Sequence, residues 1–128
     1  MGNKGLLFGL AAILGVFFVT RQLQAADGID VTEAQRMSQN GALLLDVREP
    51  DEYAAGHAPN ALLIPLGQLG SRLQEVAAYK DKPVAVMCRS GRRSASAVGQ
   101  LTEAGFTRVK NVNGGILAWE QAGLPVVR

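Results

Sequence analysis

The chain has 128 residues, of which 48% are hydrophobic and 5% aromatic, enough apolar material for one hydrophobic core and too little for two. Its formal net charge is +2, but Lys4 and Arg21 lie in the first 26 residues, which contain no acidic residue, and the remainder carries 11 basic and 11 acidic residues. A neutral domain argues against a nucleic-acid partner, because phosphate backbones select clustered basic surfaces.

The first feature along the chain is an uninterrupted run of apolar residues and glycines from Leu6 to Val19, preceded by Lys4 and followed by Arg21. As a helix this run would be ~21 Å long, shorter than the ~30 Å hydrocarbon core of a bilayer. The length is typical of a secretory signal peptide, but cleavage after Ala25 or Ala26 would lack the usual small residue three positions before the cut. An uncleaved membrane anchor is therefore the alternative.

We accordingly expect residues 1–26 to be a signal peptide or a membrane anchor, and residues 27–128 to be the folded domain. Contact with a membrane would involve residues 5–20. The positive charge of Lys4 ahead of the apolar run favours an amino terminus on the cytoplasmic side. The domain would then be periplasmic, or anchored to the membrane outside the cytoplasm.

Short apolar segments alternate with amphipathic ones through the rest of the chain. Residues 27–30 are predicted to be a linker, and Thr32 with Gln35 has the pattern of a capping box, which opens a helix that ends near Gly41. The other predicted helices cover residues 50–56, 67–79, 94–104 and 116–122, and the predicted strands cover residues 42–47, 62–64, 83–87 and 108–112. Strands alternating with helices indicate an α/β fold with a parallel sheet covered on both faces.

The loop Cys88-Arg89-Ser90-Gly91-Arg92-Arg93 follows a predicted strand and precedes a predicted helix. In an open parallel sheet, ligands bind beyond the carboxyl ends of the strands, which is where this loop lies. Successive backbone N–H groups, the amino end of the following helix and three arginines all favour a thiolate over a thiol. The pKa of Cys88, the only cysteine of the chain, is therefore predicted to lie below the ~8.5 of free cysteine.

The sequence resembles the rhodanese family over nearly all of residues 30–127. The loop CRSGRRS is similar to the rhodanese active-site loop, whose cysteine is the nucleophile. Three further stretches are similar to family motifs: LLDVRE at residues 44–49 with Glu52-Tyr53 and Gly56-His57, residues 60–65, and Asn113-Gly114-Gly115-Ile116 with Trp119 and the end Gly123-Leu124-Pro125-Val126. The resemblance implies a rhodanese-like three-layer fold, with a central parallel sheet flanked by helices on both faces.

The resemblance also implies the activity of a thiosulfate sulfurtransferase. Such an enzyme moves a sulfane sulfur from a small anionic donor such as thiosulfate to cyanide or a thiol acceptor, through a cysteine persulfide and without a metal or organic cofactor. Cys88 is the expected nucleophile. The expected substrate-binding residues are those of its loop, Arg89, Ser90, Gly91, Arg92 and Arg93, with Arg93 at the position where the family most often has a basic residue or threonine.

Four residues outside the loop have both a structural and a functional interpretation. Asp46 and Arg48 lie at the same sheet edge as the Cys88 loop, where they would either orient it or form an ion pair that braces the following turn. His57, the only histidine, is interpreted as structural, because a thiolate stabilised by its surroundings needs no general base. Trp119 is expected in the core.

Two other functions use a similar loop. A cysteine phosphatase has an arginine six positions after its cysteine, where this chain has Ser94. Strong activity with thiosulfate and weak activity with phosphate esters would argue against the phosphatase alternative. A persulfide carrier that delivers sulfur to a partner protein uses the same residues, and it is distinguished by slow release to small acceptors.

Overall fold

The computed structural model describes residues 28–128. The expected signal peptide or membrane anchor at residues 1–26 lies outside this range. Within the described range, no helix combines the length and the apolar character needed to cross a membrane.

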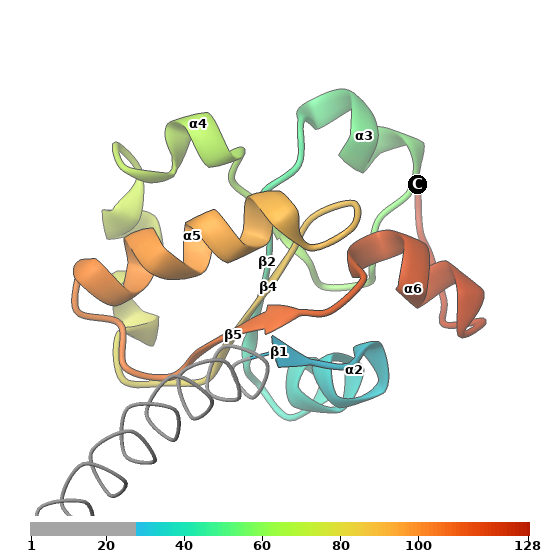
Figure 1. The fold of residues 1–128 in the computed structure, drawn as a ribbon, viewed down its shortest axis with the longest axis horizontal. Helices are drawn as coiled ribbons and strands as arrows, with labels where there is room; N and C mark the ends of the chain where they lie inside the picture. Colours follow the sequence, from blue (N-terminus) through green and yellow to red (C-terminus); the bar gives the residue numbers. More distant parts are fainter. Residues whose placement is uncertain (1–27) are drawn as a thin grey trace, which may run out of the picture.

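A parallel sheet forms the centre of the domain (Figure 1). Among residues 28–128 its strands are β1 (Gly28–Ile29), β2 (Leu43–Asp46), β3 (Leu62–Leu63), β4 (Val84–Met87) and β5 (Val109–Val112). Their order is β1-β5-β4-β2-β3, and every pairing is parallel. β4 is the middle strand, and its carboxyl end leads directly into Cys88.

Helices cover both faces of the sheet (Figure 1). They are α2 (Val31–Gln39), α3 (Pro50–Ala55), α4 (Leu66–Leu69), α5 (Arg92–Glu103) and α6 (Gly115–Gln121), together with the 3₁₀ helix η1 (Leu73–Tyr79). α4 and α5 lie on one face, and α2 and α6 lie on the other. The expected three-layer α/β fold is therefore confirmed.

The two layers of core follow from the alternation of side chains along the central strands. In β4, Val84 and Val86 pack with residues of α5 such as Leu101, whereas Ala85 and Met87 pack with residues of α2 and α6. Cys88 continues the alternation of Val84 and Val86. Its side chain consequently faces the α5 side of the sheet.

The chain around residue 30 differs from its prediction in two respects. Gly28 and Ile29, predicted as part of a linker, form β1, which pairs with β5; a strand of two residues has no alternation that a pattern could reveal. The predicted capping box is also wrong. Asp30 is the N-cap of α2, because its carboxylate accepts a hydrogen bond from the N–H of Glu33 at 2.8 Å, and Thr32 lies inside the helix.

The single helix predicted over residues 67–79 is wrong as well, because the segment divides into α4 and η1. Leu73, Val76 and Tyr79 of η1 all pack against the core on the α5 face. A spacing of three residues matches the three residues per turn of a 3₁₀ helix. The other predicted strands and helices occur in their places, with ends shifted by no more than about two residues.

Candidate active site

Cys88 lies at the carboxyl end of β4, at the base of the loop that leads into α5. The residue is only 1% exposed and belongs to the core cluster on the α5 face. Arg89 and Ser90, which follow it, are exposed. In Figure 1 the loop between β4 and α5 extends toward α3 and α6.

Two hydrogen-bond donors of the loop and helix point at the sulfur. The N–H of Gly91 lies 3.0 Å from Sγ of Cys88, and the hydroxyl oxygen of Ser94 lies 3.4 Å from it. Burial raises the pKa of the thiol, but hydrogen bonds from the Ser94 hydroxyl and from the backbone N–H groups of Ser94, Gly91 and Ser90 outweigh burial and lower the pKa below its ordinary value. The direction is the one expected from the sequence, and its source is these hydrogen bonds.

The shape of the loop depends on two glycines. Gly91 has φ +112° and is the N-cap of α5, a conformation that a side chain would strain. Gly115, at φ +55°, lies so close to the loop that a Cβ atom there would be 2.3 Å from the carbonyl oxygen of Cys88. This close approach lets the N–H groups of Ile116 and Leu117 donate to the carbonyls of Cys88 and Arg89, at 2.9 and 3.2 Å.

Ser94 and Asn111 complete the surroundings of the sulfur, and sequence reasoning assigned a site role to neither. Ser94 is fully buried, and its hydroxyl donates to Oδ1 of Asn111 at 2.5 Å. Nδ2 of Asn111 donates to the carbonyl of Gly91 at 3.3 Å. Asn111 belongs to β5, 17 residues beyond Ser94, and a polar side chain on a buried strand was the one signal that pointed to it.

The three arginines of the loop occupy two different environments. Arg93 makes a bidentate ion pair with Glu52 of α3, with distances of 2.6 and 2.9 Å. This pairing, opposed by burial, lowers the pKa of Glu52 to about 2. Arg89 and Arg92 are exposed, and their guanidinium groups form no hydrogen bond or ion pair with other described residues. Glu52 is a further residue of the site that sequence reasoning did not assign.

Asp46, the last residue of β2, and Arg48 form a buried ion pair. The closest contact joins Nη2 of Arg48 and Oδ2 of Asp46 at 2.8 Å, and the two side chains are at most 5% exposed. The guanidinium of Arg48 also donates to the carbonyls of Gly56 and Glu52, at 2.8 and 3.3 Å. These contacts connect Arg48 to the first turn of α3 and to its C-cap Gly56, so the geometry favours the bracing interpretation over an orienting one.

The comparison with known proteins identifies the family. The family model "Rhodanese-like domain" matches residues 30–122. The chain belongs to the rhodanese-like domain family. It is similar to a protein of Allochromatium vinosum named "Sulfurtransferase", at 42% identity over 95 residues, which cover 73% of this chain and 87% of the relative. It is also 40% identical to "Thiosulfate sulfurtransferase GlpE" of Vibrio cholerae over 99 residues, covering 77% of this chain and 92% of the relative.

Solved structures of the family have the same fold. A rhodanese-related protein of Thermoplasma volcanium is 36% identical and superimposes with a TM-score of 0.67, over 78% of this chain and 96% of that protein. The rhodanese-like assignment therefore rests on sequence and on architecture together.

His57 and Trp119 of this rhodanese-like domain have the structural positions expected from the sequence. The His57 ring stacks on Tyr53 with ring centroids 3.7 Å apart, and Nδ1 lies 2.8 Å from the backbone carbonyl of Tyr53. The backbone of His57 pairs with that of Val127 near the carboxyl terminus. Trp119 is 1% exposed, and its indole N–H donates to the carbonyl of Pro125 at 2.8 Å.

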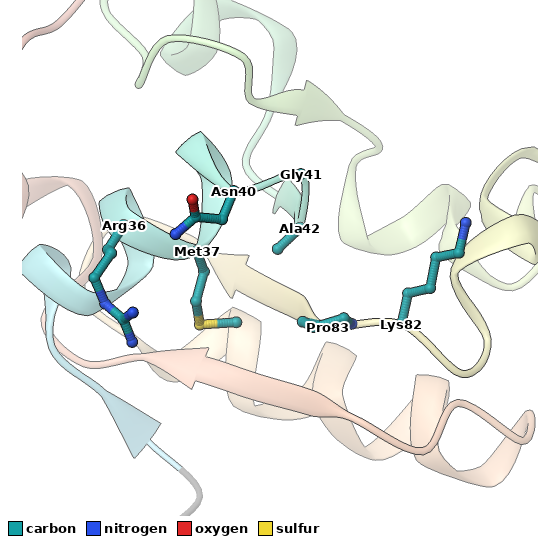
Figure 2. Close-up of a pocket in the computed structure, with 7 residues that line it drawn as sticks. All are labelled: Arg36, Met37, Asn40, Gly41, Ala42, Lys82 and Pro83. Atoms are coloured by element: carbon teal, nitrogen blue, oxygen red, sulfur yellow. The ribbon is translucent and has the colours of Figure 1, made fainter.

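A cavity of about 320 Å³ opens at the opposite edge of the rhodanese-like domain, where β2 and β4 begin. Figure 2 shows its lining, with the side chains of Arg36 and Lys82 at its two ends and those of Met37 and Pro83 between them. The length of β4 separates this cavity from Cys88. In open parallel sheets the carboxyl edge is the edge at which ligands bind, so the loop of Cys88, and not this cavity, is the candidate active site.

Proposed function

We propose that this rhodanese-like protein is a sulfurtransferase, which moves a sulfane sulfur from thiosulfate or a similar anionic donor to cyanide or a thiol through a persulfide on Cys88. The observation that carries the proposal is the position of the Cys88 sulfur at the carboxyl end of the central strand, 3.0 Å from the N–H of Gly91 and 3.4 Å from the hydroxyl of Ser94. The names of the two relatives, one a sulfurtransferase and one a thiosulfate sulfurtransferase, support it.

In the first step the Cys88 thiolate attacks the outer sulfur of thiosulfate. A new bond joins this sulfur to Sγ while the sulfur–sulfur bond of thiosulfate breaks, and its electron pair leaves with sulfite. The outer sulfur keeps its negative charge in the persulfide, and the charge of the thiolate leaves with the sulfite dianion. The donor is a dianion, so the exposed guanidinium groups of Arg89 and Arg92, which pair with no other described residue, are suited to attract it and to stabilise the departing sulfite.

In the second step the acceptor, cyanide or a thiolate, attacks the outer sulfur of the persulfide. The bond to Sγ breaks, and its electron pair restores the Cys88 thiolate. The same N–H of Gly91 and hydroxyl of Ser94 that lower the pKa of the thiol also stabilise this leaving group. One set of donors therefore serves both steps, and neither step requires a general base.

The burial of Cys88, at 1% exposure, favours a second candidate within the same chemistry. A persulfide carrier would hold one sulfur per chain at this sheltered position and release it only to a partner protein. Such a carrier would form the persulfide from thiosulfate at a stoichiometry of one and would transfer it slowly to cyanide.

The test is to incubate the purified domain with thiosulfate and cyanide and to follow thiocyanate together with the intact mass. The proposal predicts many turnovers per chain, none for Cys88→Ser, and a normal rate for Ser96→Ala, an exposed position on α5. A stoichiometric mass increase of one sulfur without turnover would identify the carrier. Equal rates for the wild type and Cys88→Ser would end the proposal, as would hydrolysis of phosphate esters faster than transfer from thiosulfate.

We further propose that residues 1–26 direct the protein to or across a membrane and leave the folded domain outside the cytoplasm. The apolar run Leu6–Val19 behind Lys4 motivates this proposal. Intact-mass measurement of the protein from separate membrane and soluble fractions tests it. A shortened soluble form indicates cleavage, a full-length membrane-bound form indicates an anchor, and a full-length form in the cytoplasm alone would contradict both.

A further inference from the structure

The hydroxyl of Ser94 lies between two acceptors that compete for its single hydrogen. One is Oδ1 of Asn111 at 2.5 Å, and the other is Sγ of Cys88 at 3.4 Å. A hydroxyl has one hydrogen to donate and two lone pairs with which to accept. The hydrogen therefore serves either the amide or the sulfur, and a full bond to one leaves the other without it.

The orientation of Asn111 is fixed from its other side. Nδ2 of its amide donates to the carbonyl of Gly91, which can only accept, so Oδ1 is the atom turned toward Ser94. The backbone of Asn111 is held as well, because β5 lies between β1 and β4 and Asn111 is paired with Gly28 and Val86. The amide thus presents a stationary acceptor to the Ser94 hydroxyl.

We propose that Asn111 is a positioning residue, which acts through the hydroxyl of Ser94 and thereby sets how readily the sulfur of Cys88 holds negative charge. When the sulfur is a thiol, the hydroxyl donates to Asn111 and accepts from the S–H group. When the sulfur is a thiolate, the hydroxyl turns to donate to Sγ and gives up its bond to Asn111. The amide therefore stabilises the uncharged sulfur relative to the charged one.

If the proposed function holds, this exchange of the Ser94 hydrogen also takes place during the reaction cycle. In the persulfide the charge lies on the outer sulfur, so Sγ no longer needs the Ser94 hydrogen, and Asn111 accepts it. When the acceptor removes the outer sulfur, the hydrogen returns to Sγ as charge develops there. Asn111 thus offers a low-energy position to the hydroxyl between the two steps, without touching either substrate.

The charged groups already present around Cys88 stay the same in every variant that the test requires, and only Asn111→Asp adds a new one. They are Arg89 and Arg92 of the loop, the Arg93–Glu52 pair that joins α5 to α3, and the Asp46–Arg48 pair at the end of β2. Changes at Ser94 and Asn111 therefore alter hydrogen bonding without removing any of these charges.

The test measures the pKa of Cys88 from the ultraviolet absorbance of the thiolate as a function of pH. Cys88 is the only cysteine of the chain, so the signal arises from this sulfur alone and requires no turnover. The variants are Asn111→Leu, which removes the acceptor, and Asn111→Asp, which retains one. Both lose the bond to Gly91, and Asn111→Asp also adds a negative charge near the sulfur. Each variant is therefore measured with and without the Ser94 hydroxyl, and the part of the change that disappears with this hydroxyl is the part that acts through it.

We expect the pKa of Cys88 to fall by about half a pH unit in Asn111→Leu and to rise by about one pH unit in Asn111→Asp, where the carboxylate holds the hydroxyl more strongly and also repels the thiolate. Without the Ser94 hydroxyl, the rise in Asn111→Asp should be smaller. In a Ser94→Ala background, which by itself raises the pKa, the Asn111→Leu substitution should have no effect. Ser96→Ala is the matched control for the loss of a hydroxyl from α5.

A change of equal size and sign for Asn111→Leu with and without Ser94 would overturn the proposal, as would a rise of the pKa in Asn111→Leu. Should Asn111→Leu fail to fold, Asn111→Ala takes its place in the same comparison. Because the readout is ionisation, a negative result here leaves the sulfurtransferase proposal standing, and an absence of thiocyanate production leaves this one standing.

Discussion

Glu52 and Arg93 join helix α3 to the helix that begins at the loop of Cys88. Two hydrogen bonds of 2.6 and 2.9 Å connect the carboxylate to the guanidinium. Oε1 of Glu52 also accepts a hydrogen bond from the backbone N–H of Glu49. This bond is part of a capping box and holds Glu52 in place. The guanidinium of Arg93 is therefore paired within the domain, whereas those of Arg89 and Arg92 form no ion pair with a described residue.

Replacement of Glu52 by glutamine should destabilise the domain in a pH-dependent way. The pKa of Glu52 is lowered from 4.5 to about 2, so its ionised pair stabilises the folded state above pH 4.5, and this contribution is lost as the pH falls toward 2. Because the pair is partly exposed, we expect a loss of about 1–2 kcal/mol at neutral pH. Urea unfolding at several pH values measures it.

The matched control is Glu33→Gln, which removes an ion pair with Arg36 on the surface of α2. A much smaller change is expected there, since exposed pairs contribute little. A loss of stability in Glu52→Gln that is as large at pH 2 as at pH 7 would show that the ion pair is not its cause.

Alanine at Gly115 should displace the active-site loop. Its Cβ would lie 2.3 Å from the carbonyl oxygen of Cys88, and its φ of +55° disfavours any side chain. Strain and overlap together should cost about 3 kcal/mol and reduce thiocyanate production at least tenfold. Gly99→Ala is the control, because this glycine lies within α5 with open space around it, and alanine should stabilise the helix by about 0.5–1 kcal/mol. Equal unfolding midpoints for the two variants would refute the explanation.

Removing one partner of the Asp46–Arg48 pair should lower the free energy of unfolding more than removing both partners. Arg48→Met leaves the carboxylate of Asp46 buried without its partner, a change that costs about 3–5 kcal/mol. In the double variant Asp46→Asn/Arg48→Met no uncompensated charge remains, so part of this loss should be recovered. Denaturant midpoints of the three proteins measure the difference, and a double variant less stable than Arg48→Met would contradict the prediction.

Arg89 and Arg92 should affect the donor rather than the fold. Both are exposed and belong to the loop that begins at Cys88, so Arg89→Gln and Arg92→Gln should each raise the KM for thiosulfate about two- to fivefold. The free energy of unfolding should change by less than about 0.5 kcal/mol. Added salt should reduce the difference in KM between each variant and the wild type. Unchanged KM values in the variant lacking both arginines would remove them from donor binding.

The main features of the fold could be predicted because local pattern and global architecture agree in the central strands. Runs such as Val84–Met87 are apolar on both faces and occur only where a sheet is covered on both sides. The secondary-structure predictions were wrong at β1, which is too short to show a period. They were also wrong at residues 66–79, where an α-helix and a 3₁₀ helix follow one another with similarly spaced apolar residues. Neither case leaves a distinctive pattern in the sequence.

For the site, the sequence predicted the position of Cys88 and the direction of its pKa shift, because a strand, a glycine-containing loop and a helix follow one another directly. It did not reveal Glu52 or Asn111 as neighbours of the loop. Their partners Arg93 and Ser94 are 41 and 17 residues away along the chain. Contacts of this kind depend on how helices and strands pack, and no local spacing encodes them.

The hydrogen bonds from α6 to the loop orient a peptide dipole that faces the sulfur of Cys88. In a trans peptide the C=O and N–H bonds point in opposite directions, so the carbonyl of Arg89, turned toward Leu117, sends the N–H of Ser90 toward the sulfur. Helix α6 therefore orients part of the dipole field that this sulfur experiences, although its hydrogen bonds go to backbone carbonyls of the loop and not to the sulfur. Substitutions at the start of α6 should therefore shift the pKa of Cys88.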